Sequence, residues 1–119
     1  MEKQQQLFRK TIGVYAESLA DRSMKKLWDH SAGLFREQFP LEMLDREFGR
    51  NFKYAKDYSE ISKMTPIIDS ADFGEDGLLV IRGHYPIRPR PLYIRQSFVF
   101  EGIDWKSAGL VTRVGQPAG

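Results

Sequence analysis

The fold is decided by residues 78–101, which read LLVIRGHY (78–85), PIRPRP (86–91) and LYIRQSFVFE (92–101). The outer two runs are rich in β-branched and aromatic residues, and they flank a proline-rich segment, which is the pattern of two paired strands. Proline has no backbone N–H to donate to a strand ladder, so Pro86, Pro89 and Pro91 belong to the connection or to the strand ends. The stretch therefore predicts a long antiparallel β-hairpin.

The hairpin also predicts which side chains share a face, because successive residues of a strand point to opposite sides. With Arg88 to Arg90 at the tip, the expected pairs are Tyr85–Ile94, Gly83–Gln96, Ile81–Phe98 and Leu79–Phe100. One face is then almost wholly apolar and should pack against helices. Its expected core residues are Leu79, Ile81, Tyr85, Ile94, Phe98 and Phe100. The opposite face carries Arg82, His84 and Arg95 and should point away from the core.

The residues on either side of the hairpin predict three helices before it and one strand after it. Apolar residues recur at helical spacing in the first half of the chain, whereas alternation is typical of the second half. The expected helices are 3–20, 24–30 and 41–50, followed by a connector to about residue 63. The expected further strands are 64–73 and 105–114, with a bulge near Gly109 because the apolar alternation slips there.

Composition narrows the class of protein and the chemistry. The chain has 119 residues, 41% of them hydrophobic, which fits one globular domain. A net charge of +2 does not favour nucleic-acid binding, and no run is long and apolar enough to predict a membrane span. With no cysteine and only two histidines, the sequence predicts no disulfide, no metal centre and no cofactor. The polar N-terminus is unlike a signal peptide, which fits a cytoplasmic chain or an exported one whose signal was removed.

Helices followed by a meander of long strands form an α+β layout. Two stretches carry a resemblance to a known family: residues 15–28, where a long helix breaks into a short one bearing Trp28, and residues 98–111, FVFEGIDWKSAGLV. The chain resembles the nuclear-transport-factor-two-like superfamily, although Ser107 stands where an aliphatic residue is usual. The resemblance implies one domain over residues 1–119, with three helices packed on a curved antiparallel sheet in a cone-shaped, cystatin-like roll. It also implies a pocket between the helices and the sheet.

The residues expected at that pocket are Tyr15, Trp28, Tyr85, Gln96 and Phe98. In one interpretation the polar groups are paired within an apolar core, as buried polar groups normally are. In the other, they orient a small apolar ligand. The hairpin supplies no inward carboxylate, and the adjacent Asp29 and His30 do not face one another on a helix, so no catalytic residue is predicted.

A second predicted surface consists of Arg82, His84, Arg88, Arg90 and Arg95, which would contact an acidic protein partner. The alternatives are that the charges on the sheet face are only solvated, and that the hairpin tip only prevents pairing with another strand edge. On function, the sequence favours a small non-catalytic binding or protein-interaction domain that forms a homodimer. The rival hypothesis is a small lyase or isomerase, of the SnoaL or ketosteroid-isomerase type that the resemblance suggests, acting on an apolar substrate.

Overall fold

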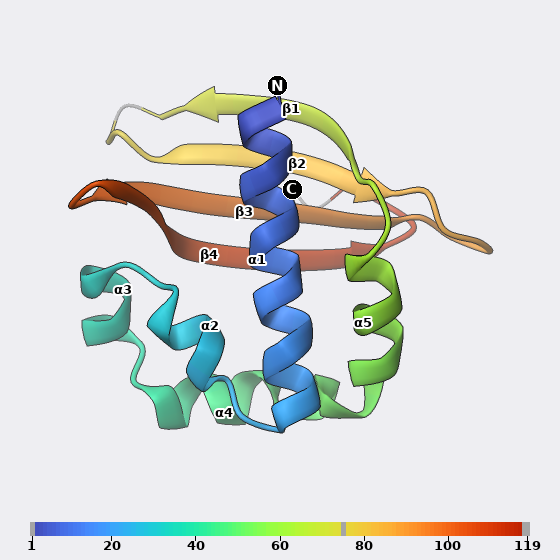
Figure 1. The fold of residues 1–119 in the computed structure, drawn as a ribbon, viewed down its shortest axis with the longest axis horizontal. Helices are drawn as coiled ribbons and strands as arrows, with labels where there is room; N and C mark the ends of the chain where they lie inside the picture. The colour runs from blue at the N-terminus through green and yellow to red at the C-terminus, as the bar shows by residue number, and fades with distance from the viewer. Residues whose placement is uncertain (1, 75, 118–119) are drawn as a thin grey trace.

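Helices precede a four-stranded antiparallel sheet in the computed structural model, which describes residues 2–74 and 76–117 (Figure 1). The helical elements are α1 (Glu2–Asp21), α2 (Lys25–Asp29), α3 (Gly33–Gln38), α4 (Leu41–Phe48), the 3-10 helix η1 (Gly49–Tyr54) and α5 (Ala55–Ser62). The strands are β1 (Ile67–Phe73), β2 (Leu79–Tyr85), β3 (Leu92–Glu101) and β4 (Asp104–Val114), in that order across the sheet. The predicted α+β class, with helices on a curved antiparallel sheet, is confirmed.

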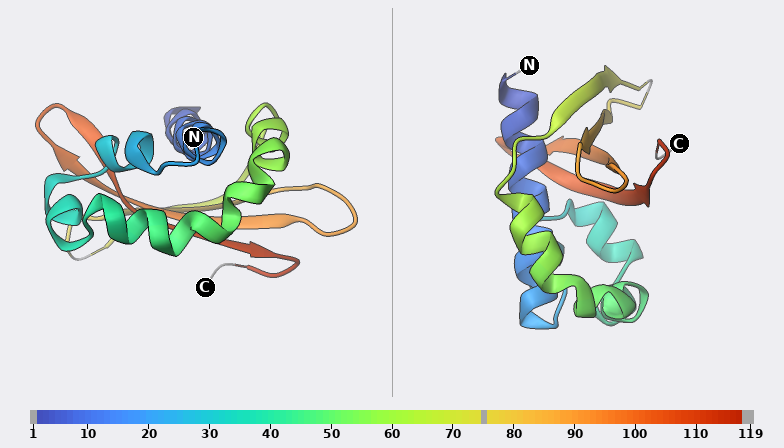
Figure 2. Two further views of the ribbon diagram at one scale, coloured as in Figure 1. Left: turned by 90° about the horizontal axis from the view of Figure 1, so that it is seen from below. Right: turned by 90° about the vertical axis from the view of Figure 1, so that its right-hand side faces the viewer.

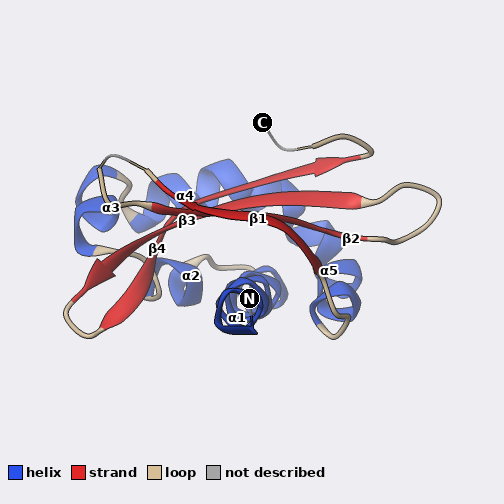
Figure 3. Ribbon diagram, turned by 90° about the horizontal axis from the view of Figure 1, so that it is seen from above, coloured by secondary structure: helices blue, strands red, loops and turns tan. Residues whose placement is uncertain are grey.

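Helix α1 organises the helical layer by crossing all four strands, with α2 and α3 on one side of it and α5 on the other (Figure 1). Helix α4 and η1 run along the free edge of β4 (Figure 2). Seen along α1, that helix and α5 lie against one face of the sheet, and the segment after β4 leaves on the opposite face (Figure 3). One face of the sheet is thus covered by helices.

The apolar stripe of α1 explains why this helix packs on the sheet. Phe8, Ile12, Tyr15 and Leu19 recur every three or four residues and are all fully buried. Phe8 and Ile12 join the sheet residues in one core cluster, whereas Tyr15 and Leu19 pack with α2 and α4 in a second. The chain therefore has two adjoining cores, one under each half of α1.

The pairing of β2 with β3 differs from the expected pairing by two residues. Tyr85 lies opposite Leu92, and Leu79 lies opposite Phe98. A shift by an even number of residues leaves each side chain on its predicted face, so the other inward residues of the hairpin are buried as expected. Phe100 is the exception and the prediction for it is wrong: its side chain is 57% exposed, because it lies past Leu79, the first residue of β2.

The bulge that the sequence predicts near Gly109 is confirmed. Ser97 pairs with Gly109 and Phe98 with Ser107, which leaves Ala108 as the extra residue of β4. Ser107 is buried and fixes the start of β4 to the helical layer. Its N–H donates to the carbonyl of His30 at 3.2 Å, and its carbonyl accepts from the N–H of Ala32 at 2.8 Å.

The helical layer contains more elements than the three predicted helices. Helix α3 forms between the second and third predicted helices, where no helix was predicted, and α5 forms within the predicted connector. The predicted helix over 41–50 ends at Phe48 and continues as η1. Strand β1 begins at Ile67, three residues later than expected.

His30 lies beside the junction between α2 and β4, with its Nε2 3.2 Å from the Oγ1 of Thr11. Burial lowers the pKa of His30 below its usual 6.5, and the positive charges of Lys10 and Lys106 lower it further, while Asp104 acts in the opposite direction. The folded chain therefore holds this imidazole neutral at pH values where the unfolded chain binds a proton.

Acidification is therefore expected to lower the stability of the folded chain. Below about pH 6.5 the unfolded state binds more protons at His30 than the folded state does, so the free energy of unfolding falls as the pH falls towards the lowered pKa. We expect His30→Gln to make this free energy less dependent on pH between about pH 7.5 and pH 5.5. Urea unfolding at both pH values measures the difference. An equal pH dependence in the wild type and the variant would contradict the assignment.

Candidate functional site

A cavity of about 510 Å³ lies between the free edge of β4 and the segment from α3 to η1. Its volume is within the range of small-molecule sites, about 300–1,000 Å³. We call it the α4–β4 cavity. Its lining residues are Phe35, Phe39, Met43, Leu44, Glu47, Phe48, Arg50, Asn51, Gly109, Leu110, Val111 and Thr112.

One face of α4 supplies much of the apolar lining. Leu44 and Phe48 lie one helical turn apart on this face, and Met43 lines the cavity beside them. Two more aromatic rings come from α3 and the residues just after it: Phe35 and Phe39 stack with their centroids 4.8 Å apart. The cavity wall is therefore mainly apolar and rich in aromatic rings.

Two uncharged polar side chains, Asn51 and Thr112, also line the cavity, and each is tied to a tyrosine behind the wall. Asn51 Nδ2 donates to the hydroxyl of Tyr15 at 3.1 Å, and Thr112 shares a side-chain hydrogen bond with Tyr58. The two tyrosine rings meet edge to face at 5.0 Å. These contacts hold the amide and the hydroxyl in place, so a ligand would meet two fixed polar groups.

Burial raises the pKa of both tyrosines above the usual value of 10.0. Near neutral pH both are therefore uncharged. Among the described lining residues, only Glu47 and Arg50 carry charge, and both are exposed at the rim. The interior of the α4–β4 cavity thus offers apolar contact and neutral hydrogen bonding.

The five predicted pocket residues fall into two groups. Tyr15 lies directly behind the cavity wall, and Trp28 supports its rim by donating from Nε1 to the carbonyl of Phe39 at 3.0 Å. Tyr85, Gln96 and Phe98 are fully buried between α1 and the sheet and line none of the cavities described here. Asn51 and Thr112 were not predicted as cavity residues. Asn51 falls in the segment that was expected to be a connector, and Thr112 lies on the expected last strand, for which no site residue was predicted.

Tyr85 and Gln96 each have one buried side-chain atom without a hydrogen-bond partner among the described residues. These atoms are the hydroxyl of Tyr85 and the Oε1 of Gln96, although Gln96 Nε2 donates to the carbonyl of Phe8 at 3.1 Å. Burial raises the pKa of Tyr85 to about 12. Gln96 therefore ties the middle of β3 to α1, and Tyr85 stays uncharged near neutral pH.

The predicted contact residues lie in two places. On the sheet face away from α1, Arg82 lies directly opposite Arg95, and His84 Nδ1 lies 2.9 Å from Asp69 Oδ2. Arg88 and Arg90 are exposed on the loop between β2 and β3. The structure thus brings Arg82, His84 and Arg95 together and sets the two loop arginines apart at one end of the sheet (Figure 1).

Two further features, a metal-binding group and a membrane-spanning helix, are absent from the described residues. Within residues 2–74 and 76–117, no group of three or more histidine and acidic side chains is placed to hold a metal ion. No helix in the same part of the chain combines the length and the apolar character needed to cross a membrane.

The fold and cavity define an α+β protein with an apolar cavity beside its sheet. No protein-family model, curated protein or solved structure matches the chain.

Proposed function

We propose that this protein is a non-catalytic binding domain for a small, mainly apolar ligand, held in the α4–β4 cavity. The observation that carries the proposal is the combination of aromatic and aliphatic walls with two fixed neutral polar groups, Asn51 and Thr112. Ligand sites of this kind take most of their affinity from apolar contact and their orientation from a few polar groups. The ligand that fits is apolar, with one or two uncharged hydrogen-bonding groups.

A lyase or isomerase in the same cavity would need a side chain that transfers a proton within hydrogen-bond reach of the substrate. The only carboxylate in the described lining is Glu47, which is exposed at the rim. This distribution favours binding over proton transfer. The resemblance to the nuclear-transport-factor-two-like superfamily, the homodimer and the acidic protein partner all stay predictions.

The binding of N-phenyl-1-naphthylamine, a neutral fluorescent probe, tests the proposal. We expect it to bind in the cavity and to shift the NMR signal of the Trp28 indole N–H, which is bonded to the rim residue Phe39. Met43→Trp should raise the dissociation constant of the probe about tenfold or more, because the larger ring fills the space that the probe needs; tenfold corresponds to about 1.4 kcal/mol.

Met64→Trp is the matched control, because Met64 is 43% exposed and does not line the cavity. It should leave the dissociation constant and the Trp28 shift unchanged. The proposal fails if the folded wild type does not bind the probe, or if both tryptophan variants bind it as well as the wild type does.

A further inference from the structure

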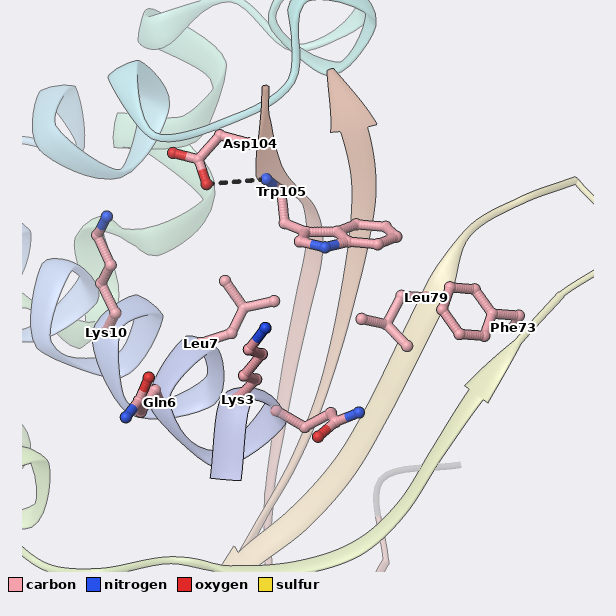
Figure 4. A pocket seen from close by; sticks show the side chains of 9 residues that line it. Lys3, Gln6, Leu7, Lys10, Phe73, Leu79, Asp104 and Trp105 are labelled. Carbon is pink, nitrogen blue, oxygen red and sulfur yellow. Dashed lines mark hydrogen bonds between the residues drawn. The ribbon is translucent and has the colours of Figure 1, made fainter. Parts of the chain in front are cut away.

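A second hollow of about 350 Å³ lies between the first turns of α1 and the ends of the strands near the β1–β2 and β3–β4 turns (Figure 4). We call it the α1 groove. Leu7 of α1, Leu79 of β2, Trp105 of β4 and Phe73 of β1 form its apolar surface. The groove shares no lining residue with the α4–β4 cavity.

Three aromatic rings gather at this end of the sheet, and two of them are exposed. The Trp105 ring contacts the rings of Phe73 and Phe100, at centroid distances of 5.9 Å and 5.2 Å. Phe73 is 69% exposed and Phe100 is 57% exposed. Exposed apolar clusters of this kind mark interaction sites more often than isolated exposed residues do. A ligand with an apolar body could therefore cover rings that the chain leaves in water.

The charge at the groove is positive on the helix side. Lys3 and Lys10 are separated by seven residues, which is two helical turns, and both line the groove. Neither has an ion-pair partner among the described residues. The groove has one described carboxylate, Asp104, and its Oδ1 accepts from the N–H of Trp105 at 3.1 Å. Glu2 lies on another side of α1, beside Ile67.

We infer that the α1 groove binds a small amphipathic anion. Its aromatic or aliphatic body would lie on Trp105 and Phe73, and its carboxylate or sulfonate would lie between Lys3 and Lys10. The two sites then differ in the ligand that they prefer: the α4–β4 cavity offers neutral polar groups, whereas the groove offers two ammonium groups at the edge of an apolar surface. The inference does not depend on the proposed function of the cavity.

Two related probes test the charge preference. 8-Anilinonaphthalene-1-sulfonate has the same ring system as N-phenyl-1-naphthylamine and adds one sulfonate. The two tryptophans report separately, because Trp105 lines the groove and Trp28 supports the cavity rim. We expect the sulfonate probe to shift the indole N–H signal of Trp105, and to bind there about tenfold more tightly than the neutral probe, since two exposed charge contacts contribute on this scale.

Charge-neutralising variants separate the head-group contact from the general charge of the protein. Lys3→Gln with Lys10→Gln should raise the dissociation constant of the sulfonate probe at Trp105 about tenfold and leave that of the neutral probe unchanged. Lys56→Gln with Lys63→Gln removes the same charge from exposed sites outside the groove, and should change neither. Phe73→Ser, at an exposed position, should weaken the binding of both probes at Trp105.

Three outcomes would overturn the inference. The Trp105 signal could fail to move with the sulfonate probe while the protein is folded. The two double lysine variants could bind the probe equally, which would leave no role for Lys3 and Lys10. Sedimentation velocity could show a dimer that Phe73→Ser dissociates, with the probe binding only to the monomer, in which case the groove is an interface between two copies of the chain.

Discussion

Phe98→Ala is expected to lower the free energy of unfolding by about 3–5 kcal/mol, the usual cost of truncating a fully buried phenylalanine. Phe98 is 0% exposed and belongs to the core cluster formed by α1, α5 and the sheet. Removing the ring leaves a cavity that the surrounding α1 and β2 side chains cannot fill without moving. Urea unfolding of the variant and the wild type under the same conditions measures the loss.

Phe100→Ala is the matched control, two residues further along the same strand and on the same face. Phe100 is 57% exposed, and its ring contacts that of Trp105 at a centroid distance of 5.2 Å. We expect a smaller loss of about 1–2 kcal/mol, because an aromatic pair contributes about 0.5–1.5 kcal/mol beyond the apolar area that it buries. Equal losses at the two positions would contradict the pairing of β2 with β3, because they would place Phe100 in the core.

Gly83→Ala is expected to destabilise the protein by about 1–3 kcal/mol, the cost of inserting an extra carbon into a packed core. A Cβ at this position would lie 2.7 Å from the backbone carbonyl of Ile67 and 3.1 Å from the ring of Phe8. The carbonyl belongs to the neighbouring strand and cannot turn aside as a side chain can. The melting temperature and urea unfolding would both report the loss.

Gly13→Ala, the same substitution at an open position, is expected to stabilise the protein instead. Gly13 lies within α1, and among the described residues no atom other than those of its chain neighbours and the helix's own backbone lies within 4 Å of a Cβ placed there. Alanine should therefore stabilise the protein by up to about 1 kcal/mol through its helix propensity. If Gly83→Ala were as stable as the wild type, α1 could not pack on β2 as closely as the structure shows.

The faces of the hairpin were predictable, but its register was not. The alternation of apolar and polar residues assigns each side chain to a face, and this assignment is unchanged by a shift of two residues. The register depends on where the proline-rich connection of residues 86–91 ends, which alternation does not reveal. The error therefore appeared only at the end of the hairpin, where Phe100 extends past β2.

The α4–β4 cavity could not be predicted, because two of its boundaries are elements too short to show clear periodicity. Helix α3 has six residues, and η1 is a six-residue 3-10 helix. Tyr58 and Ile61 do recur at helical spacing in α5, and could have indicated that helix. Tyr15 and Trp28 were predicted near a pocket through the resemblance, whereas the positions of the fixed polar groups depend on where η1 and β4 meet.

The α1 groove could not be predicted from the sequence for a different reason. Its two main rings, Phe73 and Trp105, lie on opposite edge strands of the sheet and come together only through the curvature of that sheet. The two lysines show helical spacing in the sequence, but an amphipathic helix carries lysines on its solvent face as a rule. Only the packing direction of α1 shows that these lysines border an apolar surface.

The extra residue at Ala108 has a consequence for how this chain is compared with others. A bulge shifts the alternation of a strand by one residue from that point onward. Even-numbered Leu110 and Thr112 therefore point to the same face of the sheet as odd-numbered Ser107. In a relative that lacks the bulge, β4 would be one residue shorter. An alignment of the two chains should place its gap at Ala108, because a gap placed after Val114 would match inward residues with outward ones along half of the strand.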